Sequence, residues 1–156
     1  MRRSDREVTE RAAIAAIIQA CDCCRLGFVD DAGAYILPLN FGFAQDAAPW
    51  VLYFHGAAEG KKIDLIKAQP HVSFEMDTHH TLNTASAACG FSFGFQSVMG
   101  QGDIALVEDA DEKARALNCI MAHYTDRADW AFPAEALSHT AIMRLSITAL
   151  SCKVHA

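Results

Sequence analysis

The sequence has no apolar run of the length that a membrane-spanning helix needs, which is about 18 residues or more. It also lacks a surplus of basic residues, because 13 Lys and Arg stand against 19 Asp and Glu, for a formal net charge of −6. Binding to a nucleic-acid backbone depends on such a surplus. We therefore expect neither a membrane nor nucleic acid as a partner. With 52% hydrophobic residues, the chain is too apolar to stay disordered.

Cysteine and glycine motifs that would define a function are also missing. The chain has six cysteines but is too long and too rich in core residues for a small disulfide scaffold, so we expect reduced thiols and a cytoplasmic protein. Cys21, Cys23 and Cys24 form a cluster and His79-His80 adds two imidazoles, but the paired two-residue spacings of structural zinc sites are absent. We predict no metal site, and zinc at the cysteine cluster is the alternative. No Gly-x-Gly-x-x-Gly motif is present, so a nicotinamide would have to bind transiently.

Hydrophobic periodicity predicts one domain, residues 1–156, without repeats or linkers. Ser4 followed by Glu7 fits a capping box, which predicts a helix from there to about Ala20. Residues 78–94, rich in Thr, Ser, Ala and Gly, are expected to form a long loop. Other predicted helices are 61–69 and 109–124, and predicted strands are 26–29, 34–43, 50–55, 72–77, 95–107 and 141–154. Antiparallel strands with segregated helices favour a small barrel in a mainly β (α+β) fold.

The most informative stretch runs from Tyr53 to Ile63. A strand is predicted to end at His55, glycines then allow a tight turn, and Lys61 and Lys62 fall in the first turn of the next helix. The free N–H groups and the dipole of a helix N-terminus favour an anion, so this is a predicted phosphate site. Lys62 is the stronger candidate, because neighbours on a helix point about 100° apart and both need not reach one group. The alternative is two solvated lysines.

Five motifs, taken in order, make the chain recognisable. They are Tyr35-Ile36-Leu37-Pro38-Leu39-Asn40-Phe41, then Tyr53-Phe54-His55-Gly56 with Gly60-Lys61-Lys62, then Val72-Ser73-Phe74-Glu75, then Phe95-Gln96-Ser97-Val98 with Gly100 and Gly102, then Glu112-Lys113 with Leu117. In this order the sequence resembles the nitroimidazole-resistance (NimA-like) branch of the pyridoxamine 5′-phosphate oxidase-like flavoproteins. The similarity covers nearly the whole chain.

This resemblance implies a split β-barrel homodimer that binds FMN in clefts shared by the two subunits. Matched onto this sequence, it implies that the isoalloxazine ring, the ribityl chain and the phosphate are contacted by Pro38, Asn40, Phe41, Phe54, His55, Gly56, Lys61, Lys62, Ser97, Val98 and Gln101. The two lysines would meet the phosphate, and Asn40 or His55 would supply a donor near the ring's N1 and C2 carbonyl, which raises the reduction potential. Phe95 stands where the family often has Tyr, so that hydroxyl is absent here.

The implied function is an FMN-dependent oxidoreductase. Electrons would pass from a reduced nicotinamide, NADH or NADPH, through FMN to a small aromatic or nitroaromatic acceptor, with His55 as the candidate catalytic proton donor. A structural His55 is the alternative. The alternative function is a non-catalytic binding or sensor protein of the same fold that holds FMN or haem, with His55, His79 or His80 on the haem iron. A deazaflavin is a third possible cofactor.

Overall fold

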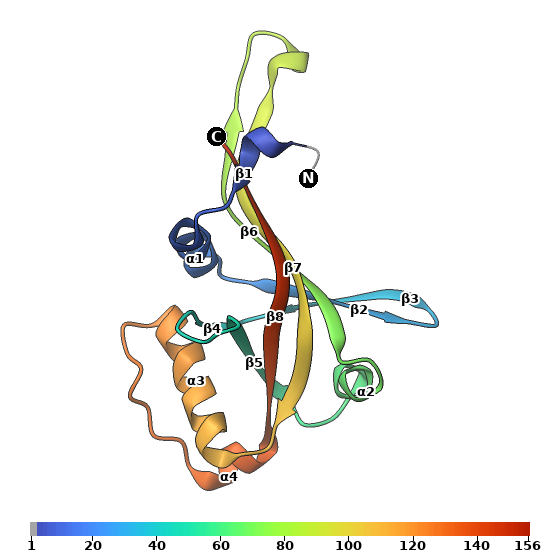
Figure 1. Cartoon of the computed structure of the whole chain (residues 1–156), viewed down its shortest axis with the longest axis vertical. Helices are drawn as coiled ribbons and strands as arrows, with labels where there is room; N and C mark the ends of the chain where they lie inside the picture. The colour runs from blue at the N-terminus through green and yellow to red at the C-terminus, as the bar shows by residue number, and fades with distance from the viewer. Residues whose placement is uncertain (1–2) are drawn as a thin grey trace.

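Three long antiparallel strands form the centre of the molecule in the computed structural model, which describes residues 3–156 (Figure 1). Eight strands make one sheet in the order β3-β2-β6-β7-β8-β5-β4, with the short β1 paired to β8. Their bounds are β1 Glu7–Val8, β2 Cys24–Asp30, β3 Gly33–Leu39, β4 Gly42–Ala44, β5 Val51–Ala57, β6 His71–Asn83, β7 Ser92–Val107 and β8 Thr140–His155. Every strand pairing in the described chain is antiparallel, which confirms the mainly β (α+β) class.

The two outermost strands of the sheet are joined by a very short link. β3 and β4 stand at opposite ends of the strand order, yet only Asn40 and Phe41 separate them in sequence. From Leu39 to Gly42 the chain can span about 11 Å at most, so the sheet must curl until its two edges approach each other. The described strands show no pairing between β3 and β4, so the sheet is not closed. The structure is therefore a split barrel, as expected, with residues 40–41 at its seam.

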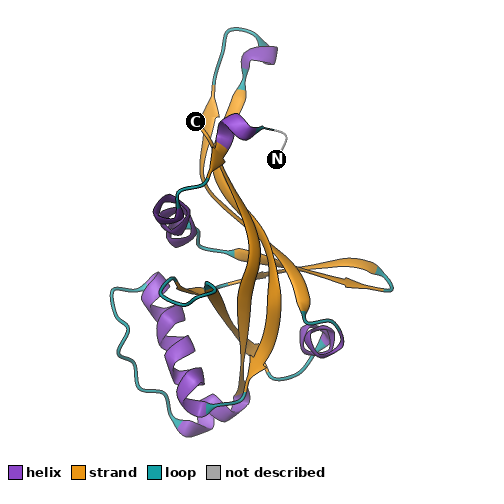
Figure 2. Cartoon of the chain, in the orientation of Figure 1, coloured by secondary structure: helices purple, strands orange, loops and turns teal. Residues whose placement is uncertain are grey.

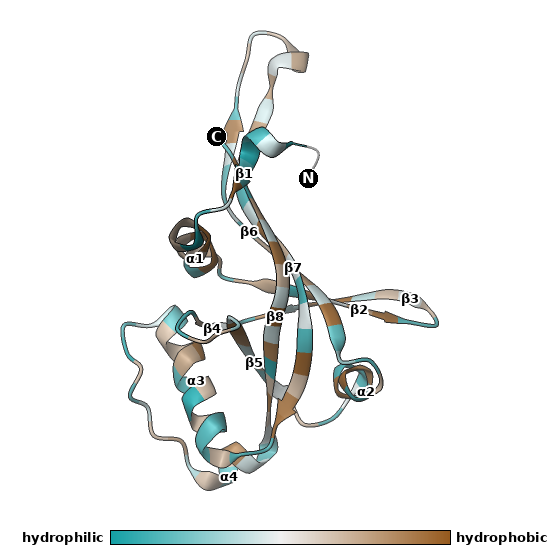
Figure 3. Cartoon of the chain, in the orientation of Figure 1, coloured by the Kyte–Doolittle hydropathy of each residue, from teal (hydrophilic) through white to brown (hydrophobic). Residues whose placement is uncertain are grey.

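Helices lie against this curled sheet (Figure 2). Their bounds are α1 Arg11–Ala20, α2 Lys61–Ala68, α3 Ala110–Tyr124 and α4 Ala134–His139, with 3-10 turns η1 Ser4–Arg6 and η2 Ala88–Gly90. Hydrophobic and hydrophilic residues alternate along β7 and β8, so one face of each strand joins the core (Figure 3). The core also takes Ile14, Ile17 and Ile18 from α1. No helix in residues 3–156 is both long enough and apolar enough to cross a membrane.

Several local predictions hold. Asp109 caps α3, because its Oδ1 accepts a hydrogen bond from the Glu112 N–H at 2.7 Å. The register of β7 shifts between Gln101 and Gly102, where the glycines predicted a bulge. Pro38 lies on β3, an edge strand, as a strand proline predicted. The single domain over residues 1–156 stays a prediction, and residues 1–2 lie outside the described part.

Three local predictions are wrong. The first helix begins at Arg11, not Ser4, because residues 4–6 form a 3-10 turn and Glu7–Val8 pairs with β8. The predicted strand 34–43 is interrupted at the seam, and β4 pairs with a different neighbour from β3. The third prediction is wrong only in part: residues 84–91 are a connection that includes η2, whereas residues 78–83 and 92–94 belong to β6 and β7 and form the extended end of their hairpin (Figure 1). This hairpin arm projects beyond the sheet and is exposed over most of its length, so it has no apolar face for a sequence pattern to reveal.

Candidate functional site

The corner between β5 and α2 gathers several of the predicted site residues. β5 ends at Ala57, and Gly60 takes φ 108°, a left-handed conformation that glycine adopts without steric cost. α2 then begins at Lys61 and anchors itself by burying Ile63 and Ile66. The first N–H groups of a helix have no intrahelical acceptor, so the start of α2 is electropositive.

The two lysines of this corner have different surroundings. The Lys61 Nζ lies 2.5 Å from the Asp30 Oδ2 and sits over the Tyr35 ring, 4.7 Å from its centroid. Its hydrogen bond, together with the Ala32 N–H, lowers the pKa of Asp30. Within residues 3–156, no carboxylate forms an ion pair with Lys62. Lys62 is thus the amine left available for an external anion.

Lys62 also folds back over β5. A Cβ atom built on Gly56 would lie 2.8 Å from the Lys62 Cε and 3.2 Å from its Nζ. Any side chain at position 56 would push this amine away, so the glycine makes room for Lys62 against the strand. The result is a small cationic cradle made of Gly56, Lys62 and the start of α2.

Asn40 lies at the seam, between two strand ladders. Leu39 pairs with Cys24 at the end of the β2–β3 ladder, and Gly42 pairs with Tyr53 at the end of the β4–β5 ladder. The Asn40 and His55 side chains are both exposed. Phe41 and Phe54 are fully buried, so these two can offer a ligand only their backbone. His55, Gly56 and Lys62 lie together between the end of β5 and the start of α2, and we call them the corner cluster.

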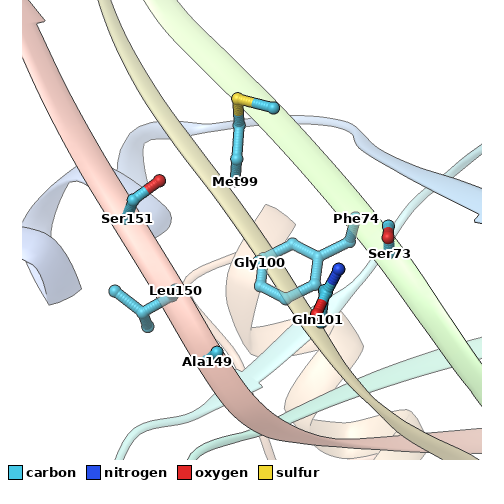
Figure 4. Close-up of a pocket in the computed structure, with 8 residues that line it drawn as sticks. All are labelled: Ser73, Phe74, Met99, Gly100, Gln101, Ala149, Leu150 and Ser151. Carbon is cyan, nitrogen blue, oxygen red and sulfur yellow. The ribbon is translucent and has the colours of Figure 1, made fainter. Parts of the chain in front are cut away.

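The β7 residues lie in a second cluster. Ser97, Met99 and Gln101 alternate on one face of β7, whereas Val98 is fully buried on the other. Gln101 and Met99 line an open groove of about 350 Å³ with Ser73, Phe74, Gly100, Ala149, Leu150 and Ser151 (Figure 4). The Phe74 ring lies across Gly100, where a Cβ would come within 2.5 Å of ring atoms. A neighbouring pocket of about 230 Å³ includes Ser97 and shares Met99 with the first.

These two clusters are far apart in one chain. On β8, Ile142 lies opposite His55, whereas Ala149 lies opposite Gln101, seven residues further along. At about 3.3 Å per residue this separates them by roughly 23 Å. Ser97 pairs with Lys153 and is further still. The remaining predicted residue, Pro38, is exposed. It pairs with Arg25 on β2, which pairs with Glu75 on β6, which in turn pairs with Met99 on β7.

The sequence reading missed Met99 and Phe74 as groove residues. The signal was the alternation of Ser97, Met99 and Gln101, which places a large apolar side chain on the outer face; Met99 is 57% exposed. An ionic network lies on the same face, where the Arg25 Nη1 donates to Glu75 Oε2 at 3.0 Å and to Asp77 Oδ1 at 2.5 Å. Burial tends to raise the pKa of Asp77, but hydrogen bonds from Arg25 and His80 lower it overall.

The cysteines do not form a chemical centre. Cys21 and Cys24 are buried, and burial raises the pKa of both thiols, that of Cys21 to about 12. Within residues 3–156, no three His, Cys, Asp or Glu side chains come together in an arrangement that could hold a metal ion.

Comparison with known proteins gives the family. A family model described as pyridoxamine 5′-phosphate oxidase matches residues 10–154. The chain therefore belongs to the pyridoxamine 5′-phosphate oxidase family, and the resemblance found in the sequence is confirmed. No curated protein matches the chain significantly.

Solved structures share the fold. A candidate 5-nitroimidazole antibiotic resistance protein from Bacteroides thetaiotaomicron is similar at a TM-score of 0.82 and 29% identity, over 95% of this chain and 86% of that one. Flavocytochrome Anf3 from Azotobacter vinelandii has a TM-score of 0.80 and 22% identity, over 100% of this chain and 72% of that one. A FAD and haem binding protein from Mycobacterium smegmatis has a TM-score of 0.83 and 17% identity, over 96% and 73% of the two chains.

Proposed function

We propose that this protein binds FMN at the corner cluster and works as a flavin-dependent oxidoreductase. One observation carries the cofactor assignment: Lys62 folds over Gly56 at the start of α2 without a carboxylate partner, while its neighbour Lys61 is held by Asp30. An amine, free backbone N–H groups and a helix dipole at one point fit a phosphate monoester. The family and the flavin-binding proteins that share this fold support the same assignment.

The rest of the corner cluster suits the flavin ring and chain. His55 presents an exposed polar side chain on β5, next to the buried Phe54, and Asn40 presents one at the seam, next to the buried Phe41. When bound, FMN would supply the redox chemistry, taking a hydride from NADH or NADPH and passing electrons to a small aromatic or nitroaromatic acceptor. His55 would hold the proton that the acceptor takes up.

A homodimer would complete the cleft. Ser97 and Gln101 lie about 23 Å or more from His55 along β8, so within one chain they cannot line the same pocket as Lys62. A second copy related by a twofold axis would bring its β7 groove to the corner cluster of the first. Two equivalent FMN sites per dimer follow from this arrangement.

A haem-binding role is the second candidate. His79 takes φ 54°, a rare conformation for a residue with a side chain, and lines a pocket of about 330 Å³ together with His155. Two of the proteins that share the fold are described as binding haem or as a flavocytochrome. In this role the chain would hold its ligand as a store or sensor.

Spectra of the purified protein separate these functions. We expect FMN to bind and the bound flavin to be bleached by NADH or NADPH without oxygen, then reoxidised by a nitroaromatic compound. An intense Soret band after addition of haem, with no FMN uptake, would favour the second candidate. Uptake of FMN without reduction by either nicotinamide would leave a binding protein and overturn the oxidoreductase.

A further inference from the structure

A pocket of about 200 Å³ lies beside the first residue of α1, away from the corner cluster. One charged side chain, Arg11, lines it together with Thr148, Trp50 and four apolar residues, which are Pro49, Ile147, Ala149 and Leu150. None of these is a residue that the sequence predicted for the flavin site, and the pocket shares only Ala149 and Leu150 with the β7 groove. It is therefore a separate candidate for a ligand site.

Arg11 rests on a fixed aromatic surface. Its guanidinium carbon lies 3.8 Å from the centroid of the Trp50 ring, so the cation stacks on the indole face. Trp50 is 5% exposed and meets the Phe43 ring edge to face, with centroids 5.2 Å apart. Its Nε1 has no hydrogen-bond partner within residues 3–156, so packing holds the indole in place. Arg11 is thus preorganised, and it has less freedom to lose when a ligand binds.

The charge of Arg11 is not neutralised by the protein. In the part of the chain that the structure describes, no carboxylate forms an ion pair with it. The neighbouring Glu10 does not cap α1 with its side chain, and the first turn of α1 holds no acidic residue. A cation at a helix N-terminus is disfavoured by the helix dipole, so this arginine does not stabilise α1 by its charge. The guanidinium is available to an external anion.

A bulge in β8 shapes the wall opposite in sequence to Trp50. Gln101 pairs with Ala149 and Gly102 pairs with Ile147, so Thr148 is an extra residue without a partner on β7. The Thr148 hydroxyl donates to the carbonyl oxygen of Gln101 at 3.2 Å, so its hydrogen is already used. Arg11 is therefore the one side chain of this pocket that can donate to an anion, and most of the other lining residues are apolar.

We propose that this pocket binds a small carboxylic acid with an apolar body, of the kind that an aromatic acid provides. The planar fork of Arg11 pairs with the carboxylate through two parallel hydrogen bonds, and Pro49, Ile147 and Leu150 contact the apolar body. A free phosphate fits less well, because it would find a single donor side chain and apolar walls. The site is independent of the proposed flavin function, since it shares no residue with the corner cluster.

Calorimetric titration of the protein without added flavin tests the assignment with three probes. Benzoate has both the charge and the ring, benzamide keeps the shape without the charge, and phosphate has the charge without the ring. We expect wild type to bind benzoate at least tenfold more tightly than either of the others. Arg11→Gln should lose at least tenfold in benzoate affinity and no longer distinguish benzoate from benzamide. Arg115→Gln, which removes an exposed arginine of α3, serves as the control and should bind as wild type does.

A second measurement leaves Arg11 in place, because Arg11→Gln also removes the stack on Trp50. The chain has two tryptophans, and Trp130→Phe leaves Trp50 as the only one. We expect benzoate to change the fluorescence of Trp50 over the same concentrations that calorimetry reports. Equal affinity of wild type for benzoate and benzamide, equal benzoate affinity of wild type and Arg11→Gln, or an unchanged Trp50 signal overturns the site. Phosphate binding as tight as that of benzoate overturns the assigned class of ligand.

Discussion

Lys61 and Lys62 are adjacent and chemically identical, so only their surroundings distinguish them. Lys61 is engaged by Asp30 and the Tyr35 ring, and these contacts tie α2 to the β2–β3 hairpin. Lys62 rests on a glycine and has no carboxylate partner in the described chain. A charge-assisted hydrogen bond contributes roughly 1.5–3 kcal/mol, so an unpaired lysine is worth more to an anionic ligand than one already paired.

The thiols should differ in reactivity by their burial. Burial raises the pKa of Cys21 to about 12, whereas Cys89 is exposed at the tip of the hairpin arm. The thiolate is the reactive form, so we expect iodoacetamide at neutral pH to modify Cys89 at least about a hundredfold faster than Cys21 or Cys24. Peptide mass spectrometry after short exposures measures this. Equal rates for Cys21 and Cys89 would contradict the described burial.

The ionisation of Asp77 should make the stability of the protein fall as the pH is lowered. Its pKa is lowered in the folded protein, so its contribution to stability is present above the ordinary pKa of about 3.9 and is lost as the pH falls through the folded value. The Arg25 contact is partly exposed, which limits the effect to about 1 kcal/mol or less. We expect thermal unfolding to show Asp77→Asn less stable than wild type at pH 6, with a gap that narrows as the pH falls through the folded pKa of Asp77. A gap that does not change with pH would assign the effect to packing.

At the level of elements, the packing of α3 against the sheet should depend on one glycine, Gly42. Gly42 has the helix backbone in contact, whereas the nearest atom to a Cβ on Gly27, also in a strand, is 3.7 Å away. Overpacking typically costs about 1–3 kcal/mol, and rigid backbone cannot yield as a side chain does. We expect Gly42→Ala to lower the free energy of unfolding by at least 2 kcal/mol, near the upper part of that range, and Gly27→Ala to change it little. Similar denaturant midpoints for the two variants would show that α3 moves freely.

The elements that the sequence predicted well have strong patterns. α3 has a capping Asp109 and an apolar stripe, and β8 alternates over most of its length. The hairpin arm was missed because Leu82 and Phe93 are exposed, 58% and 51%, so burial imposes no alternation on it. Its strands are held by pairing between β6 and β7, which depends on register and not on a hydrophobic face.

The candidate site was only partly open to sequence reasoning. The corner cluster could be predicted because His55, Gly56 and Lys62 are close in sequence, and a strand–turn–helix unit keeps them together. The separation of Gln101 from His55 could not be predicted, because it depends on the pairing of both β5 and β7 with β8. The hydrogen bond between Phe41 and Tyr124 likewise joins residues 83 positions apart, so no local pattern indicates it.

The whole molecule exposes more surface than a compact monomer of its size. A folded chain of 17.0 kDa is expected to expose about 7,700 Å², whereas this one exposes 9015 Å². The excess exceeds the roughly 800 Å² that each partner buries in a standard interface. The projecting hairpins and the exposed Met99 account for part of it (Figure 1). A second copy that covers the β7 groove would remove this excess.

Met99 gives a test of that assembly. We expect wild type to sediment as a dimer, and Met99→Glu to shift it to monomer with at least a tenfold loss of FMN affinity, because the groove would no longer complete the cleft. Ala122→Glu, which adds the same charge on the exposed surface of α3, serves as the control. A monomeric wild type that binds FMN tightly would contradict a shared cleft.

The central claim, that Lys62 holds the phosphate of a bound flavin, is tested most directly by comparing FMN with riboflavin, which lacks the phosphate. Titrations of wild type, Lys62→Ala and Lys61→Ala with both ligands, followed by flavin fluorescence, isolate the phosphate contribution. We predict that wild type prefers FMN, that Lys62→Ala loses at least tenfold of this preference with riboflavin affinity unchanged, and that Lys61→Ala loses less. An equal preference for FMN in wild type and Lys62→Ala would contradict the account.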